Sequence, residues 1–366
     1  MATITFELKK FFANTKNLVL IGLVVLVTIL FCVQQNSQMA SDYQKKAQEY
    51  DDIYNGLIGQ SSSAGKEKAD PELLPYFSRA ITAVEKEVDG INTHNWRKAL
   101  KQENILIDQV MKIDQTEPTG ISWATKKAQD KNKFYLSHDI KPDSSVYGVS
   151  ALYFMRQISP FVFSVYGFLF FVFLFYDLFI REVERNNKSW LKTLPFLYQK
   201  IELSKLIVGL LLMIITTFVV ILAAFLTGLV LTGHLGSLNY PMKFTYRGST
   251  LASLPFYQYC LLSWMLLFVG VFIFLLIVLG LSKLRLKSEK VLLVGVIGSV
   301  VISQVSKMLR TYSFINSQDT VIKIFKHNSV NQAFVILGGV SLLIILILLL
   351  SRKLLESKKP AKSIKI

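Results

Sequence analysis

One short segment has the composition of a phosphate-binding loop. Residues 59–66 read GQSSSAGK. A phosphate loop of the G-x-x-x-x-G-K-[ST] type places four residues between its glycines, so that consecutive backbone N–H groups surround the phosphates. Here five residues separate Gly59 from Gly65, and Glu67 stands where a hydroxyl would bind magnesium. The segment is therefore predicted to be a polar linker.

Other residues that could support catalysis or bind a metal are scattered. No pair of the four histidines has the spacing of metal ligands, and no nucleophile, base and orienting group can be named together. Those histidines are His94, His138, His234 and His327. Cys32 and Cys260 lie in or beside apolar runs, where cysteine is ordinarily a small buried hydrophobe. We expect no active site, no metal site, no disulfide and no cofactor held by this chain.

The apolar residues, which are 52% of the 366, are pooled into six runs. A helix needs about 20 residues to cross a bilayer, and continuous runs do not fit the alternation of barrel strands. The runs are Leu18–Val33, Ile158–Ile180, Leu206–Leu231, Tyr259–Leu281, Val291–Val305 and Ala333–Leu350. The first and fifth are short and are expected to borrow flanking residues. The sequence predicts an all-α integral membrane protein with six transmembrane helices.

The formal net charge of +16 is unevenly distributed. Residues 36–157 are nearly neutral, so the basic excess lies beside or between the apolar runs, as the positive-inside rule describes. This places both termini in the cytoplasm of a multi-pass protein in the cell membrane. The segments predicted inside are 1–17, 181–205, 282–290 and 351–366. We find no basic stripe interleaved with aromatic residues, and we expect no nucleic-acid partner.

The runs predict four parts of the chain. The parts are an interfacial helix with the first transmembrane helix (1–35), an extracellular helical domain (36–157), transmembrane helices 2 to 6 (158–351) and a basic cytoplasmic tail (352–366). The tail is expected to lie against anionic membrane lipids or to hang free.

Two apolar seams run through the predicted extracellular domain. Met39 to Leu57 and Leu74 to Ile91 each repeat apolar residues at steps of three and four, which predicts a helical hairpin packed seam to seam. The first seam continues directly from the first apolar run, so one long helix is expected to cross the membrane and project outward. A third helix is predicted over Trp96–Ile113. The signal fades after Pro142, and 146–155 is left as strand or loop.

The first residues have the pattern of an amphipathic helix. Ile4, Leu8, Phe11 and Phe12 fall on one helical face, which suits a helix in the interface plane. The alternative is a simple extension of the first transmembrane helix. The candidate interfacial residues are Phe6, Leu8, Phe11 and Phe12. Residues 306–332 mix apolar and polar positions, which fits either two short helices dipping into the outer leaflet or a surface loop.

The charged segment between the second and third runs is the strongest candidate for binding another protein. Arg181, Glu182, Glu184 and Arg185 form a cluster of mixed sign that can pair internally or with a partner. Trp190, Leu191 and Leu194 add apolar area, and Pro195 ends the helix. The alternative is an ordinary positive-inside loop. The full candidate set is Arg181, Glu182, Glu184, Arg185, Lys188, Trp190, Leu191, Leu194, Pro195, Lys200 and Lys205.

This segment resembles the cytoplasmic loop of ABC-2-type permeases, the membrane subunits of bacterial ABC exporters. Asn187 and Lys188 stand where that family usually has Gly-Thr. The matching residues are Glu182, Glu184, Leu191, Thr193, Leu194, Pro195, Ile201 and Lys205. The order of six helices, the cytoplasmic termini, the interfacial first helix and the short fifth helix fit the same family. An extracellular domain after the first helix is found in a subset of it.

The resemblance implies a transport subunit that is not an enzyme. Such permeases pair with a second copy or a homologous permease and carry separate ATPase subunits, which hold ATP and magnesium. The 181–205 segment would couple to the ATPase. Apart from Asp177, no predicted crossing contains Asp, Glu, Lys, Arg or His, whereas ion-coupled carriers generally need such groups at depth. The expected cargo is amphipathic or hydrophobic, such as a peptide or bacteriocin, a lipid or a drug.

A second hypothesis belongs to another class. In it, the chain is a membrane-anchored sensor or immunity protein, and its extracellular domain binds an antimicrobial peptide. An ion-coupled carrier is disfavoured because the crossings lack charges.

The orientation can be tested with engineered cysteines in a chain from which Cys32 and Cys260 have been removed. We expect Lys188→Cys to resist an impermeant thiol reagent on intact cells, because its segment is predicted to face the cytoplasm. Lys101→Cys, in the predicted extracellular domain, is the positive control. Labelling of Lys188→Cys without permeabilisation would place the segment on the other side of the membrane.

Overall fold

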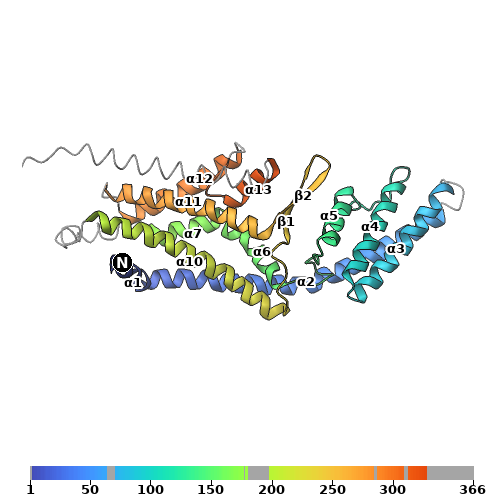
Figure 1. Cartoon of the computed structure of the whole chain (residues 1–366), viewed down its shortest axis with the longest axis horizontal. Coiled ribbons are helices and arrows are strands. Elements are labelled where there is room, and N and C mark those ends of the chain that lie inside the picture. The colour runs from blue at the N-terminus through green and yellow to red at the C-terminus, as the bar shows by residue number, and fades with distance from the viewer. Residues whose placement is uncertain are drawn as a thin grey trace, which may run out of the picture. The chain divides into compact units, whose positions relative to one another are not determined.

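The computed structural model describes residues 2–63, 71–176, 178–179, 198–283, 287–308 and 312–327. The described chain is mostly helical, with one two-stranded sheet (Figure 1). It divides into two compact units. The first comprises Met1–Val25, Gln157–Ile221 and Leu254–Ile366, and the second comprises Leu26–Arg156 and Leu222–Ser253.

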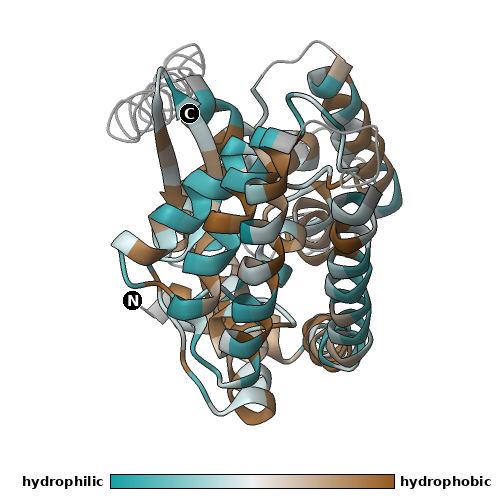
Figure 2. Ribbon diagram, turned by 90° about the vertical axis from the view of Figure 1, so that its right-hand side faces the viewer, coloured by the Kyte–Doolittle hydropathy of each residue, from teal (hydrophilic) through white to brown (hydrophobic). Residues whose placement is uncertain are grey.

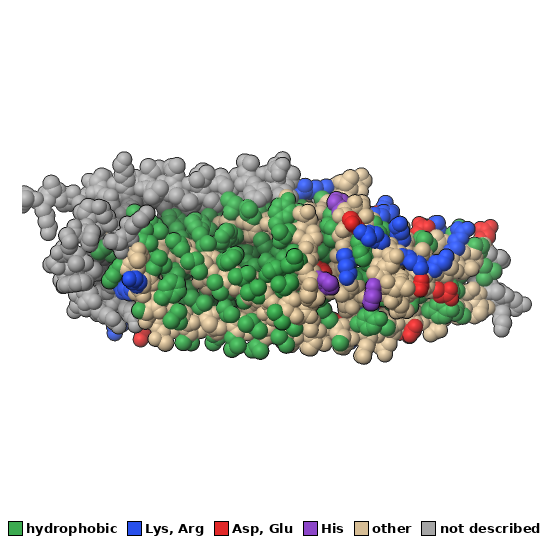
Figure 3. Space-filling model, turned by 60° about the horizontal axis from the view of Figure 1, so that its bottom comes forward, with side chains coloured by type: hydrophobic (Ala, Val, Ile, Leu, Met, Phe, Trp, Pro, Cys, Tyr) green, Lys and Arg blue, Asp and Glu red, His purple; other side chains and the backbone are tan. Residues whose placement is uncertain are grey.

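The long helices of the described chain are those expected of a membrane protein. Four helices of the described chain, α2, α10, α11 and α12, are long and apolar enough to cross a membrane, and the bent pair α6 and α7 would make a fifth. The bounds are α1 Ala2–Phe12, α2 Thr15–Ser63, α6 Ala151–Val162, α7 Val165–Phe175, α10 Tyr198–Thr232, α11 Phe256–Lys283, α12 Ser288–Met308 and α13 Ser317–His327. The sixth predicted run, Ala333–Leu350, lies outside the described residues. Figure 3 shows a face where hydrophobic side chains form a broad area with few charges.

Two sequence-based expectations for these helices need correction. The second span is not one helix over Ile158–Ile180, because α6 begins at Ala151 and the pair α6 and α7 is bent by 67°. Residues 151–155 are therefore helical rather than strand or loop. For the N-terminal residues, the structure favours the separate helix over the alternative of a simple extension of the first span, since α1 ends at Phe12 and α2 starts at Thr15.

The fifth span does borrow flanking residues, as expected, and α12 reaches 21 residues. Within the described part of residues 306–332, α12 ends at Met308 and one short helix, α13, follows.

The second unit contains the part of α2 after Val25, three further helices and most of a hairpin. Helix α4 spans Trp96–Ile113, as predicted, and is capped by Asn95, whose side chain accepts a hydrogen bond from the Lys98 N–H at 3.1 Å. The other elements are the 3₁₀ turn η2 (Pro71–Leu73), α3 (Leu74–Asn92), α5 (Lys126–Ser137), β1 (Pro241–Arg247) and β2 (Thr250–Pro255). Neither α5 nor the hairpin was predicted.

A hydrophobic core holds the helices of the second unit together. Its members from α3 and α4 include Phe77, Leu106 and Val110, which are fully buried. Helix α2 adds Ile53 and Leu57 to the same core. The predicted seam-to-seam hairpin is therefore only partly right: α3 packs chiefly against α4, and the first half of the α2 seam is exposed. Figure 2 shows hydrophilic and hydrophobic residues on the same helices, as such a core requires.

A carboxyl group is enclosed in this unit. The side chain of Glu87 is 0% exposed, and the Tyr50 hydroxyl donates to its Oε1 at 2.6 Å. Burial, reinforced by the charge of Glu103 on α4, raises the pKa of Glu87 well above its ordinary value, although Tyr50 and Lys46 oppose the shift. Burial also raises the pKa of Glu103. Both acids therefore hold a proton more tightly in the folded state than in the unfolded chain.

The raised pKa values predict that this unit loses stability as the pH rises. The free energy of unfolding is greatest below the pKa of glutamate in the unfolded chain, about 4.3. It falls as the pH rises, until the pH exceeds the pKa values of Glu87 and Glu103 in the folded state. Each unit of difference between a folded and an unfolded pKa contributes about 1.4 kcal/mol. We expect Glu87→Gln to make this slope shallower, measured by urea unfolding of the full chain between pH 4.5 and 8. The matched control is Glu85→Gln, which removes an exposed carboxyl that binds Tyr54 at 3.0 Å. A Glu87→Gln slope equal to the wild-type slope would contradict this account.

Candidate functional site

The predicted coupling segment is framed by two helix ends that the structure describes. Lys200 falls within α10, and Lys205 is the predicted member whose side chain is described. The remaining members, Arg181, Glu182, Glu184, Arg185, Lys188, Trp190, Leu191, Leu194 and Pro195, lie outside the described residues.

Lys205 connects the two ends of the segment. Its side chain is 2% exposed, and its Nζ lies 5.8 Å from the centroid of the Phe179 ring. A cation over an aromatic face is attracted to it, and the attraction strengthens when the pair is desolvated. Phe179 precedes the segment and Lys205 follows it, so the intervening chain leaves and returns at one end of the first unit.

The N-terminal helix lies against the end of α7. The rings of Phe11 and Phe175 are 6.4 Å apart, and the Asn17 side-chain amide donates to the Phe11 carbonyl at 3.1 Å. The Lys16 Nζ lies 4.5 Å from the centroid of the Tyr176 ring. We call Phe11, Lys16, Tyr176, Phe179 and Lys205 the coupling frame.

The candidate interfacial residues divide into two groups. Phe11 is 4% exposed and attaches the helix to the protein, whereas Phe6 and Phe12 are 61% and 43% exposed. Leu8 is partly buried. One side of α1 thus packs on the first unit and another presents aromatic rings outward, which fits a helix at a membrane surface.

The bend between α6 and α7 is stabilised by a distant helix. The Phe163 carbonyl accepts hydrogen bonds from the Ser317 Oγ at 2.8 Å and the Gln318 N–H at 3.0 Å, both at the start of α13. The Ser164 hydroxyl caps α7 by accepting from the Tyr166 N–H at 3.2 Å. A Cβ at Gly167 would lie 1.9 Å from the Val162 carbonyl oxygen, so this close approach requires glycine.

Two cavities of different chemistry border α12. One, of about 340 Å³, lies among the starts of α7 and α13 and is lined in part by Ser303, Gln304, Lys307 and Asp319. The other, of about 330 Å³, is almost wholly apolar and is lined by residues of α7, α11 and α12, including Phe274. The two cavities offer polar groups and an apolar surface on one helix.

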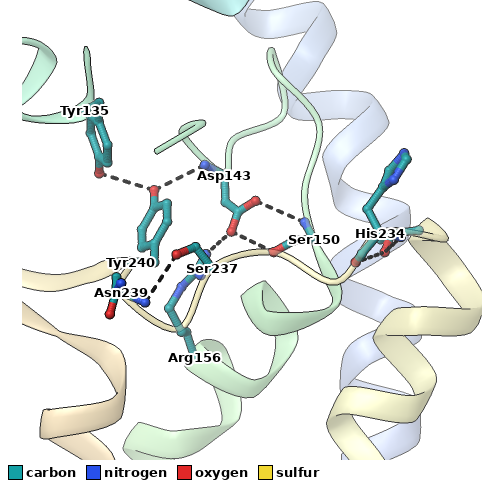
Figure 4. Close-up of polar contacts among 9 residues, drawn as sticks. Tyr135, Asp143, Ser150, Arg156, His234, Ser237, Asn239 and Tyr240 are labelled. Atoms are coloured by element: carbon teal, nitrogen blue, oxygen red, sulfur yellow. Dashed lines mark hydrogen bonds and ion pairs between the residues drawn. The ribbon is translucent and has the colours of Figure 1, made fainter. Parts of the chain in front are cut away.

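A buried ion pair forms a polar junction in the second unit (Figure 4). The Arg156 guanidinium donates to Asp143 Oδ2, and both side chains are less than a tenth exposed. Ser150 donates to the same carboxylate from its N–H at 3.0 Å and its hydroxyl at 2.9 Å. The guanidinium also lies 3.7 Å from the centroid of the Tyr240 ring. Ser150, which is close in sequence, and Tyr240, which is distant, thus enclose the charge pair.

The junction joins the helical part of the unit to the segment that leads into the hairpin. The Tyr240 oxygen accepts from the Asp143 N–H and from the Tyr135 hydroxyl, each at 3.2 Å. The Ala151 N–H donates to the His234 carbonyl at 2.7 Å. At Gly236, whose φ is +91°, a Cβ would lie 2.2 Å from the Ser150 hydroxyl. Any larger residue at Gly236 would displace this segment.

Sequence reasoning did not find the polar junction. Asp143 and Arg156 come from a segment without periodicity, and Tyr240 is far along the chain. A usable signal was present, because Arg156 is a lone cation immediately before an apolar run, where an unpaired charge is costly. Within the described residues, no group of three or more histidine, cysteine, aspartate or glutamate side chains is arranged to hold a metal ion.

Comparisons with protein-family models, with curated proteins and with solved structures return no match for this chain. The structure by itself defines a mostly helical protein with several helices suited to cross a membrane. This class is compatible with a membrane-embedded protein.

A double-mutant cycle tests whether the buried pair holds the polar junction together. Removing one partner of a buried pair leaves an uncompensated charge, which costs about 3–5 kcal/mol. We expect Asp143→Asn and Arg156→Met each to lower the free energy of unfolding by about this amount, and the double variant to cost less than the sum. The control is Lys112→Met, which breaks the exposed pair with Asp108 and should cost below about 1 kcal/mol. Additive single effects would contradict a coupled pair.

Proposed function

We propose that this chain is the permease subunit of an ATP-driven exporter of the ABC-2 type. The observation that carries the proposal is the charged segment between α7 and α10. Its residues match the coupling loop of that family from Glu182 to Lys205. The buried contact between Phe179 and Lys205, which brings the ends of the segment together, supports a compact loop on one side of a membrane.

The proposed topology has six crossings with both termini in the cytoplasm and an extracellular domain after the first. The four helices of the described residues that are long and apolar enough to cross support that number, together with the bent pair α6 and α7 if it is one span and the apolar run at Ala333–Leu350. The coupling frame supports a cytoplasmic N-terminal helix, because Phe11 of α1 packs on Phe175, and Lys16 at the start of α2 on Tyr176, at the helix end from which the coupling segment departs.

The proposed cargo is amphipathic or hydrophobic. Residues Tyr259–Leu281 of α11 contain no Asp, Glu, Lys, Arg or His, so the helix has no ionisable relay of the kind that ion-coupled carriers use. The polar and apolar cavities beside α12 would accommodate a molecule with both characters, such as a peptide, a lipid or a drug. The energy would come from ATP hydrolysis in a separate ATPase.

A second candidate function is a membrane-anchored sensor or immunity protein. It is favoured by the second unit, which has a hydrophobic core of its own that includes Phe77, Leu106 and Leu57. Such a domain could bind an antimicrobial peptide without any transport.

Copurification of an ATPase with the solubilised chain tests the first proposal. We expect Glu184→Lys and Leu194→Asp each to reduce the retained ATPase at least tenfold, which corresponds to about 1.4 kcal/mol of lost contact. Matched controls are Glu289→Lys, in another predicted cytoplasmic loop, and Leu354→Asp, in the tail. Both should retain the ATPase.

Two results would count against the proposal, and they differ in meaning. If the wild-type chain retains no ATPase, the permease assignment fails and the sensor hypothesis becomes the better account. If the wild-type chain retains it and Glu184→Lys and Leu194→Asp do too, the contact lies elsewhere on the chain.

A further inference from the structure

A cavity of about 280 Å³ lies within the second unit, between α2 and the loop that joins α4 to α5. We call it the α2 cavity. Its residues on α2 follow one another at steps of three and four, which places them on one face of the helix. Ile53 and Leu57 of this face are buried in the core of the unit, whereas Glu49 and Asp52 bring carboxylates to the cavity. The loop contributes Thr119, Gly120, Ile121, Ser122 and Trp123.

Hydrogen bonds within the loop fix the opposite wall of the α2 cavity. The Asp114 carboxylate, at the end of α4, accepts from the N–H and from the hydroxyl of Thr119, each at 2.7 Å. The Ile121 N–H donates to the Thr119 hydroxyl at 3.4 Å, and the Thr125 N–H donates to the Trp123 carbonyl at 2.8 Å. The Trp123 ring also packs against the hydrophobic core. These contacts hold the wall in place independently of a ligand, which reduces the entropic cost of binding one.

One carboxylate of the α2 cavity is paired and the other is not. Glu49 forms an ion pair with Lys46 at 2.7 Å. Asp52 is exposed, and its side chain forms no ion pair or hydrogen bond with another described residue. The Lys46 Nζ also lies 5.9 Å from the centroid of the Trp123 ring. A cation of the chain itself therefore contacts one of the acids and the indole, and Asp52 remains available to a second cation.

The lining of the α2 cavity favours an organic cation. Ile53, Leu57 and Trp123 offer apolar surface to an alkyl stem, and an aromatic face attracts an ammonium or guanidinium group. A bare metal ion would use none of this apolar surface. The volume of about 280 Å³ lies just below the range of about 300–1,000 Å³ that is typical of sites for drug-sized ligands. The cavity therefore suits a single side chain or a small amine.

We propose that the α2 cavity binds an ammonium or guanidinium group carried on a short apolar stem. Asp52 would pair with the cation, the Trp123 ring would contact it, and Ile53 would pack against the stem. This chemistry has two sources, a free organic amine and a lysine or arginine side chain of a peptide. The inference rests on the second unit alone and does not depend on export.

The test uses the full chain in detergent, labelled with fluorotryptophan and observed by fluorine NMR. The Trp123 signal is assigned as the one that is missing from the Trp123→Phe variant. Butylammonium is the probe, because it reproduces the head and the stem of a lysine side chain, and butanol is its uncharged counterpart. We expect the Trp123 signal of the wild-type chain to shift saturably with butylammonium and not with butanol.

Three substitutions on α2 test the role of charge. Asp52→Asn should weaken the binding of butylammonium about three- to fivefold, which is the size of an exposed charge pair. Asp51→Asn is the matched control, because it removes the neighbouring carboxylate, which does not line the cavity, and it should leave the binding unchanged. Lys46→Met should strengthen the binding, since it releases Glu49 and the indole of Trp123 for the probe.

Two glycines of the same helix test the location of the site. Gly56 lines the α2 cavity and Gly59 does not, and a Cβ at either position would meet no atom within 4 Å. Gly56→Leu should fill the cavity and abolish the saturable shift, whereas Gly59→Leu should preserve it. The signal of Trp96 at the start of α4, assigned in the same way, reports whether each variant keeps its fold.

A tripeptide with lysine between two alanines and with both ends blocked distinguishes the two sources. Binding at least as tight as that of butylammonium would assign the cavity to a peptide side chain, and weaker binding would assign it to a free amine.

Three outcomes would overturn the proposal. Equal shifts with butanol and butylammonium would show that the cation is not recognised. Equal losses in Asp51→Asn and Asp52→Asn would show that net charge, rather than this cavity, attracts the probe. A saturable shift that persists in Gly56→Leu would place the bound probe elsewhere.

Discussion

The constraint on which this structure depends is that backbone polar groups away from water must find partners within the protein. Continuous helices meet it locally, which is why α10, α11 and α12 need few polar side chains. The bend between α6 and α7 interrupts that local solution and frees the Phe163 carbonyl. Ser317 and Gln318 at the start of α13 satisfy it. One short helix thus makes the bend tolerable, and polar residues gather in the cavity beside it.

The second unit solves a different problem with the same physics. Its core is that of a protein in water, with apolar residues such as Phe77 at the centre, yet it encloses Glu87 and the pair of Asp143 with Arg156. The pair is enclosed with hydrogen-bond donors and an aromatic ring around it, whereas Glu87 is relieved chiefly by holding its proton. The charges of Asp143 and Arg156 compensate each other, whereas the raised pKa of Glu87 disfavours its charged form. These two arrangements give the unit distinct responses to mutation and to pH.

Sequence reasoning succeeded where a single period extends over many residues. Helix α4 was placed over Trp96–Ile113 and the first long helix was foreseen, because apolar spacing alone determines both. It failed where local signals competed with an apolar run. Pro160, Ser164 and Gly167 were visible in the second run, but its hydrophobicity outweighed them and the bend was missed. Helix α5 is too polar for its period to show, and the polar junction depends on Tyr240, whose proximity to Asp143 only the tertiary fold creates. The coupling segment remains a prediction, except that its described ends are joined through Lys205.

The attachment of α13 to Phe163 also bears on how the chain is made. The partners are 154 residues apart, and domains generally fold from the N-terminal end during synthesis. When α6 and α7 leave the ribosome, Ser317 does not yet exist. The bend therefore acquires its stabilising donors late in biogenesis, after most of the chain has been synthesised. Nascent chains stalled before that point would expose the unpaired Phe163 carbonyl and an unsupported bend between α6 and α7, which quality-control proteases would recognise.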